Sequence, residues 1–146
     1  MRTFLIVVPA FFFAAQVSAA GLDKIYAGIK TCTFNQFYYA PWDTKAPHPY
    51  FIGLQPTAQS NNDLYTFEVK DTLFGMPVVE IQVPGTWGFH SVTFNVPISK
   101  ARKVLHRKFG THFPISEKSK AGEVPALVTS EANPNQSVLY CNEPEE

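Results

Sequence analysis

Three runs of alternating apolar and polar residues, followed at once by an amphipathic helix, constrain the fold of this chain most. A two-residue period places apolar side chains on one face of a β-strand, so each run predicts a half-buried strand. The apolar sets are Tyr65, Phe67 and Val69, then Val79, Ile81 and Val83, then Val92, Phe94 and Val96. Residues 84–88, PGTWG, have the composition of a hairpin loop. The second and third strands are therefore predicted to pair antiparallel.

The helix is predicted directly after Pro97, which has no N–H to give to a β-ladder. Ser99 is the expected N-cap, and Gly110 stands where a left-handed residue ends a helix. Ala101, Val104 and Leu105 share one side, which we expect to pack on the sheet. The other side carries a cluster of basic side chains, which is typical of a solvated helix face or of a surface for an acidic partner or anionic membrane. Its members are Lys100, Arg102, Lys103, Arg107 and Lys108.

The first 19 residues have the pattern of an export signal. Arg2 precedes an apolar run from Phe4 to Ala15, and small residues lie around Ala19, where a signal peptidase would cut. A membrane span needs about 20 apolar residues, and this run is shorter. We predict a signal peptide over residues 1–19 and a single exported domain over residues 20–146. No later run predicts a transmembrane segment.

The charge balance indicates which partners to expect. Without Arg2, the 12 basic residues of the chain become 11 and face 12 acidic ones, a net charge of −1. Nucleic-acid binding relies on a general basic field, so we expect no nucleic-acid partner. The expected partner is a protein or a carbohydrate, in the cell envelope or outside the cell.

The chain has two cysteines, Cys32 and Cys141, near the two ends of the predicted domain. In an oxidising compartment, two cysteines with no other thiol available most simply form one disulfide. A redox or nucleophilic cysteine is the alternative, but there is no CxxC motif. The disulfide would close a loop of about 110 residues and stabilise the fold by up to ~4 to 5 kcal/mol.

The flanking segments are expected to complete the sheet. Residues 22–30 fit either a short helix or a strand. Residues 124–129 and 136–141 are predicted to form a final hairpin joined through Asn133, Pro134 and Asn135. The predicted fold is α+β: an antiparallel sheet of about five strands, with one main amphipathic helix packed on it and one disulfide.

Residues 37–51 combine six aromatic side chains with Pro41, Pro47 and Pro49. The prolines exclude a long helix and disfavour a central strand, so this segment is predicted to be irregular and stiff. Aromatic rings on a stiff loop suit binding, although large aromatics are also commonly buried. The candidate binding residues are Tyr38, Tyr39, Trp42, Tyr50 and Trp87.

Motifs for catalysis, cofactors or metals are absent from the sequence. There is no GxSxG elbow and no phosphate-binding glycine loop, and the four histidines lack metal-ligand spacing. Glu68 and Glu80, on adjacent predicted strands, form a carboxylate pair that is also typical of a solvated sheet face. We therefore name no catalytic residue, no metal ligand and no cofactor.

These observations favour a small exported protein, periplasmic or secreted, that acts by binding. The expected class is a binding or inhibitor-like protein with a surface patch. The alternative is a small secreted hydrolase whose acid and base lie on adjacent strands, with His90 and Glu80 as the pair to examine.

Overall fold

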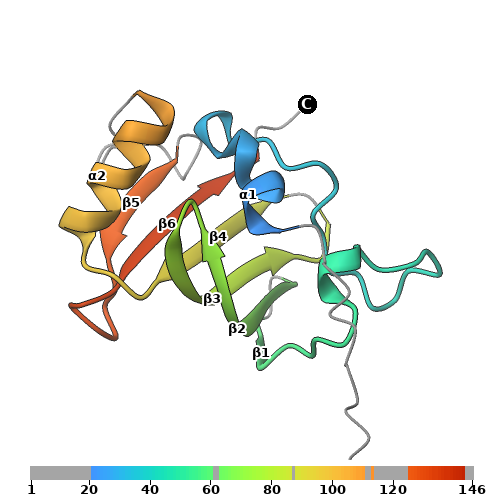
Figure 1. Cartoon of the computed structure of the whole chain (residues 1–146). Coiled ribbons are helices and arrows are strands. Elements are labelled where there is room, and N and C mark those ends of the chain that lie inside the picture. Colours follow the sequence, from blue (N-terminus) through green and yellow to red (C-terminus); the bar gives the residue numbers. More distant parts are fainter. Residues whose placement is uncertain (1–20, 61–62, 87, 111–112, 114–124, 144–146) are drawn as a thin grey trace, which may run out of the picture.

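The structure, a computed structural model, describes residues 21–60, 63–86, 88–110, 113 and 125–143. It is a six-stranded antiparallel sheet with the strand order β1-β2-β3-β4-β6-β5, packed against helices (Figure 1). The strands are β1 (Ala58–Gln59), β2 (Leu64–Leu73), β3 (Met76–Pro84), β4 (Phe89–Phe94), β5 (Ala126–Thr129) and β6 (Ser137–Asn142). The helical elements are α1 (Leu22–Ile25), η1 (Tyr26–Thr31), η2 (Pro49–Phe51) and α2 (Ile98–Phe109). The predicted antiparallel sheet with packed helices is confirmed.

The sheet has one strand more than predicted. The additional strand is β1, in which Ala58 pairs with Thr66 and Gln59 with Tyr65. The sequence does not reveal this strand, because two exposed residues carry no apolar period. The predicted hairpin of the second and third strands is β3–β4, and the predicted final hairpin is β5–β6.

One apolar row crosses five of the six strands. Phe67 pairs with Ile81, Ile81 with Val92, and Val92 with Leu139. Leu139 pairs in turn with Leu127 on β5. All five side chains are fully buried. Because neighbouring residues in a strand point to opposite faces, this row assigns one face of the sheet to the core.

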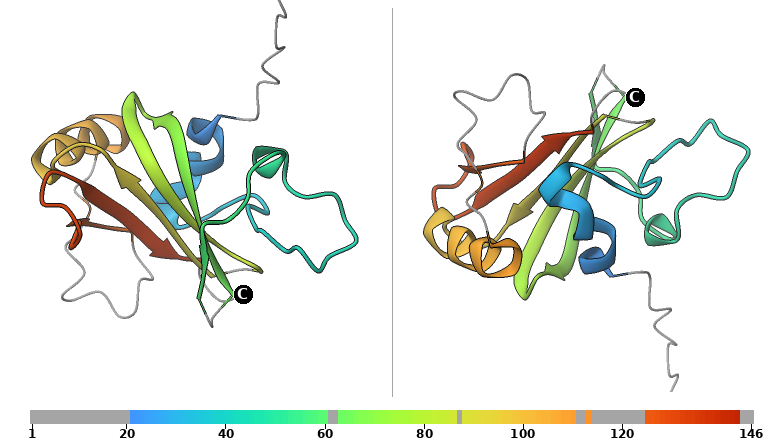
Figure 2. Two further views of the ribbon diagram at one scale, coloured as in Figure 1. Left: turned by 90° about the horizontal axis from the view of Figure 1, so that it is seen from below. Right: turned by 90° about the horizontal axis from the view of Figure 1, so that it is seen from above.

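The helices cover that core face. In both views of Figure 2, α1 and α2 lie on the same side of the sheet. Leu22, Tyr26 and Ile29 from α1 and η1 and Ala101 and Leu105 from α2 belong to the same buried cluster as the apolar row. The predicted packing of the amphipathic helix on the sheet is therefore confirmed.

The start of α2 differs from the prediction, whereas its end agrees. The N-cap is Pro97, whose carbonyl accepts from the N–H groups of Lys100 and Ala101 at 3.0 and 3.2 Å. Ser99 lies inside the first turn, so its prediction as the N-cap was wrong. The extended backbone of Pro97 already has the geometry of a residue that precedes a helix. Gly110 ends the helix in the left-handed conformation, with φ 67°, and donates to His106 at 2.8 Å.

The N-terminal segment is helical rather than extended. It begins as α1 and tightens into η1, which ends at Cys32 with a left-handed φ of 54°. The chain then turns so sharply that Thr33 donates to the carbonyl of Gly28 at 3.1 Å. A Cβ on Gly28 would collide with the Thr33 carbonyl, so the turn requires glycine. This turn points Cys32 into the core.

Two predictions concern segments outside the described residues. The predicted signal peptide and Trp87 both lie there. Within the described ranges, no helix is long and apolar enough to cross a bilayer.

The apolar row predicts a large difference between two identical substitutions. Val92→Ala removes a fully buried side chain from the row. Val79→Ala removes a half-buried one from β3. The prediction that Val79 shares the core face with Ile81 and Val83 was wrong, because the β3–β4 register shifts between Val78 and Glu80 and Val78 is buried instead. We expect Val92→Ala to lower the free energy of unfolding by about 2–3 kcal/mol, through lost burial and a residual cavity. Val79→Ala should cost less than about 1 kcal/mol. Urea unfolding of both variants measures the difference, and equal losses would contradict the assignment of the core face.

Candidate functional site

The segment from Phe37 to Gln55, which contains all the predicted binding residues except Trp87, will be called the aromatic segment. Its chain extends away from the sheet between the end of η1 and η2 (Figures 1 and 2). Tyr50 is only 6% exposed, and its hydroxyl donates to Asp71 at 3.0 Å. Burial and this carboxylate raise the pKa of Tyr50 well above its ordinary value. Tyr50 therefore acts as an anchor of the segment in the described structure.

Tyr38 and Tyr39 also have partners within the fold. Tyr39 packs edge-on against Tyr65 and Phe67, with ring centroids 5.0 and 4.9 Å apart. The Tyr38 hydroxyl donates to Glu143 at 3.0 Å. The rings of these two predicted binding residues are thus half-buried and contact the fold, as expected where large aromatics are partly buried.

Trp42 is different, because 55% of it is exposed. Its ring lies over Gly85, where a Cβ would collide with it, and 6.3 Å from the ring of Tyr65. Ile52 is 72% exposed, and it is the other large exposed apolar side chain among the described residues. Both belong to the aromatic segment, which therefore combines a buried anchor, Tyr50, with two exposed apolar side chains.

A hollow of about 390 Å³ lies within the aromatic segment. Tyr39, Pro41, Phe51 and Leu54 supply apolar walls, and Ile52 also lines it. Asp43 and Lys45 add one charge of each sign. The Asp43 carboxylate accepts from the backbone N–H of Lys45 at 3.0 Å, which holds the local turn. This hollow is of a size and composition suited to one or two apolar side chains of a partner.

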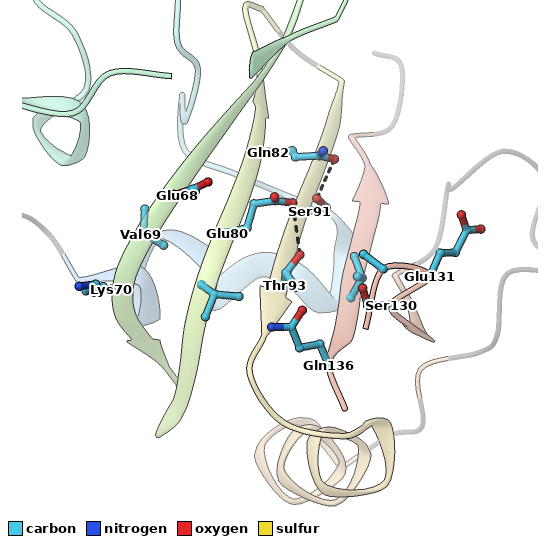
Figure 3. A pocket seen from close by; sticks show the side chains of 13 residues that line it. Glu68, Val69, Lys70, Glu80, Gln82, Ser91, Thr93, Ser130, Glu131 and Gln136 are labelled. Atoms are coloured by element: carbon cyan, nitrogen blue, oxygen red, sulfur yellow. Dashed lines mark hydrogen bonds between the residues drawn. The ribbon is translucent and has the colours of Figure 1, made fainter. Parts of the chain in front are cut away.

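The open face of the sheet carries a second, larger hollow of about 830 Å³, which we call the polar trough. Figure 3 shows its side chains projecting from β2, β3 and β4 and from the turn between β5 and β6. Ser91 donates to Gln82 at 3.1 Å and Thr93 to Glu80 at 3.5 Å. Ser91 and Thr93 are 3% and 7% exposed, so they form its floor. Hydrogen bonds between strands β3 and β4 thus hold these side chains in place on this face.

Two carboxylates oppose each other in the polar trough. Glu68 and Glu80 are direct partners on β2 and β3. The β2–β3 register shifts between Glu68 and Asp71, and the β3–β4 register shifts between Val78 and Glu80. Bulges of this kind commonly re-aim side chains next to functional sites. Burial raises the pKa of Glu80, with a contribution from Glu68, although the Thr93 hydrogen bond acts against it.

His90 and Glu80 do not come together. Ser91 and Thr93, on either side of Val92, point into the trough, so His90 and Val92 point to the core. His90 pairs with Cys141 on β6, on the face opposite to Glu80. The hydrolase pair suggested by the sequence is therefore not assembled, whereas Glu68 and Glu80 do meet.

His48 has a structural partner, since its Nδ1 accepts from the backbone N–H of Tyr50 at 3.2 Å and caps η2. Burial lowers the pKa of His48. Within the part of the chain that the structure describes, no three histidine, cysteine or acidic side chains are placed to hold a metal ion.

The two cysteines lie side by side in the core. Both are fully buried, although their sulfurs are not at bonding distance. A hydrogen bond with Cys32 and burial raise the pKa of the Cys141 thiol far above its ordinary value. The two cysteines from the two ends of the domain thus come together, as the predicted disulfide requires. The bond itself stays a prediction.

A further cluster escaped the sequence analysis. Glu143 accepts from the Tyr38 hydroxyl and from the backbone N–H of Gly88, and it faces His90. These residues come from three distant parts of the chain, so no local motif could reveal them. The only signal in the sequence is that Glu143 stands two positions after Cys141.

Comparison of the chain with protein-family models, with curated proteins and with solved structures found no match. Its function is therefore inferred from the residues themselves.

Proposed function

We propose that this chain is a small exported protein that acts by binding a protein partner through the aromatic segment. The observation that supports this proposal is that Trp42 and Ile52, the large exposed apolar side chains of the described residues, both belong to this segment. Ile52 also lines the hollow of the segment, and exposed apolar surface beside a hollow is typical of an interaction site. Export rests on the predicted signal peptide.

The segment has the physical properties of a preorganised binding surface. Tyr50 is tied to Asp71, and Tyr39 donates its backbone N–H to Pro84 at 3.0 Å. Anchors of this kind reduce the conformational entropy that is lost on binding. A tryptophan at the surface supplies a large contact area with few rotatable bonds.

A protein partner is favoured over a carbohydrate by the walls of the hollow. Tyr39, Phe51, Ile52 and Leu54 present mostly apolar surface, with charge limited to Asp43 and Lys45. Sugars need many hydrogen bonds, whereas an apolar side chain of a protein fills such a hollow directly. A carbohydrate stacked on Trp42 alone is the alternative outcome.

The proposal predicts that binding depends on two side chains. We expect the Trp42→Ala/Ile52→Ala variant to bind its partner at least about tenfold more weakly than the wild type, because surface hot spots contribute most of the affinity. The partner is first captured from an envelope extract with the immobilised domain, and its affinity is then measured by calorimetry with purified components. The Lys103→Ala/Arg107→Ala variant serves as the control, because it alters only the exposed basic side of α2. If that control weakens binding and the Trp42/Ile52 variant does not, the partner binds α2 instead.

We also propose that the exported protein carries a disulfide between Cys32 and Cys141. Oxidation of the adjacent thiols by a disulfide of an oxidoreductase would join the two sulfurs and reduce that disulfide to two thiols. The bond would link η1 to β6 across most of the sequence. Its stabilisation would come chiefly from the restricted unfolded chain.

The disulfide predicts a measurable difference between compartments. Protein recovered from the periplasm or the medium should have a mass two hydrogens lower than the same protein after reduction and should resist alkylation under denaturing conditions. Reduction should lower the free energy of unfolding by up to ~4 to 5 kcal/mol, and Cys32→Ala/Cys141→Ala should abolish this response. Two alkylatable thiols in exported, unfolded protein would contradict the bond.

A second candidate function is supported by the polar trough. Hydrolases of glycosides use two carboxyl groups, one of which stays protonated and donates to the leaving group. In that role Glu80, with its raised pKa, would be the acid and Glu68 the base or nucleophile.

The hydrolase candidate predicts turnover of aryl glycosides that fit the trough. Glu80→Gln should reduce the rate at least about 100-fold, because general acid catalysis is lost. The same variant should be as stable as the wild type or more stable, because it removes a carboxyl whose charged form is disfavoured by burial and by Glu68. Gln136→Ala is the control, because it alters the shape of the trough and leaves both carboxylates in place. No turnover by the wild type across a panel of glycosides would exclude this candidate.

A further inference from the structure

A histidine is buried in the core without a hydrogen bond. His90 is fully buried, and neither ring nitrogen has a hydrogen-bond partner within the described residues. Its ring stacks on Phe34, with centroids 3.9 Å apart, and lies 6.1 Å from Phe37. A buried polar group without a partner is uncommon and calls for an explanation.

The polar group nearest to His90 is a carboxylate that other residues hold in place. Oε2 of Glu143 lies 3.9 Å from Nε2 of His90, which is beyond hydrogen-bond distance. The same oxygen accepts from the Tyr38 hydroxyl at 3.0 Å and from the Gly88 N–H at 3.3 Å. The Glu143 N–H donates back to the Gly88 carbonyl at 3.1 Å. His90 and Glu143 thus face each other across a short gap, and we call the pair the His–Glu latch.

The latch closes the end of β6 against β4. Phe89 pairs with Asn142 and His90 with Cys141, whereas β5 pairs with β6 only as far as Tyr140. Among the described residues, β4 is thus the only strand that pairs with Cys141 and Asn142. Strand ends with few pairing partners open at a lower free energy than the body of a sheet.

The titratable groups around the latch come from three elements. Cys141 lies opposite His90 on β6, and Cys32, at the end of η1, contacts Cys141. Tyr26 of η1 donates to the Ser91 carbonyl at 3.5 Å. Among the described residues, Tyr38 and Glu143 complete the set. Glu143 supplies the single carboxylate among them.

We propose that the His–Glu latch is an acid-sensitive switch: protonation of His90 opens the end of β6 and exposes the Cys32–Cys141 pair to solvent thiol chemistry. A protonated His90 would place a positive charge in an aromatic stack, with its nearest carboxylate too far away for a hydrogen bond. Release of residues 141–143 would expose the charged His90 ring and the Glu143 carboxylate to water. The same movement uncovers Cys141, which is otherwise fully buried.

The direction of the pH effect follows from the burial of His90. Burial lowers the pKa of His90 below 6.5, and Glu143 offsets this only in part. The closed form therefore binds fewer protons than the open form, so opening becomes more favourable as pH falls below about 6.5. The pKa of Glu143 is also lowered, because the nearby His90 and the hydrogen bonds from Tyr38 and Gly88 outweigh its burial, and its protonation would add to opening below pH 4.5.

Thiol accessibility tests the switch directly. The reduced protein is treated with dithiodipyridine, which reacts with thiols at acid pH, from pH 7.5 to 5.0. The rate is divided by the rate for the urea-unfolded chain at the same pH. We expect this ratio to rise by up to about tenfold per pH unit below about 6.5, the limit for one linked proton. His90→Phe should give a flat profile.

Three variants keep the test specific. His90→Gln also removes the titrating ring and replaces His90→Phe if that variant does not fold at pH 7.5. His48→Gln and His106→Gln should keep the wild-type rise, although burial also lowers the pKa of His48. A flat wild-type profile, a rise that survives both His90 variants, or a rise abolished by His48→Gln would each overturn the switch. None of these readouts involves a binding partner, so the result is independent of the proposed function.

If the isolated protein is oxidised, the same pH series with a phosphine reductant measures access to the disulfide. The wild type should then be reduced faster below about pH 6.5, whereas His90→Phe should show no such increase. A rate that does not depend on His90 would overturn the switch for the oxidised form as well.

Discussion

The continuous apolar row from Phe67 through Ile81, Val92 and Leu139 to Leu127 is the interaction on which the rest of the structure depends. A one-residue shift in any of these pairings would move a buried side chain to the open face, so the row fixes the register of the sheet. It also provides the surface on which α1, η1 and α2 pack. Each candidate site takes its position from this register.

The same register separates the chemistry of the two faces. Val92 points to the core, so Ser91 and Thr93 point to the polar trough, where they contact Gln82 and Glu80. His90 is two positions from Val92 and therefore shares the core face with it. A histidine on that face cannot act together with Glu80, but it can face Glu143, which follows the buried Cys141.

The sheet and its main helix could be predicted because their information is local. Alternation over residues 65–69, 79–83 and 92–96 identified three strands, and the period of Ala101, Val104 and Leu105 identified the helix. The predicted N-cap was wrong because a serine side chain commonly caps a helix, whereas here the extended backbone of Pro97 already begins the helix.

The strand β1 was missed because a two-residue strand depends wholly on its partner, β2. The burial of the aromatic segment could not be predicted either. Tyr50 and Trp42 are both large aromatics on one irregular stretch, and only their tertiary contacts distinguish them: Tyr50 is buried and donates to Asp71, whereas Trp42 is 55% exposed.

The pairing of β4 with β6 explains why a stabilising crosslink and an acid-sensitive contact would occur at one place. It sets Cys141 opposite His90, and the turn at Gly28 directs Cys32 to the same point from η1. A disulfide there would restrain β6 at the residues where β5 no longer supports it. Opening of the strand end in the oxidised protein would then be limited to residues beyond Cys141, whereas the reduced protein could release Cys141 as well. The redox state of the cysteines and the protonation of His90 would therefore act on the same few residues, the first by tethering them and the second by destabilising their closed arrangement.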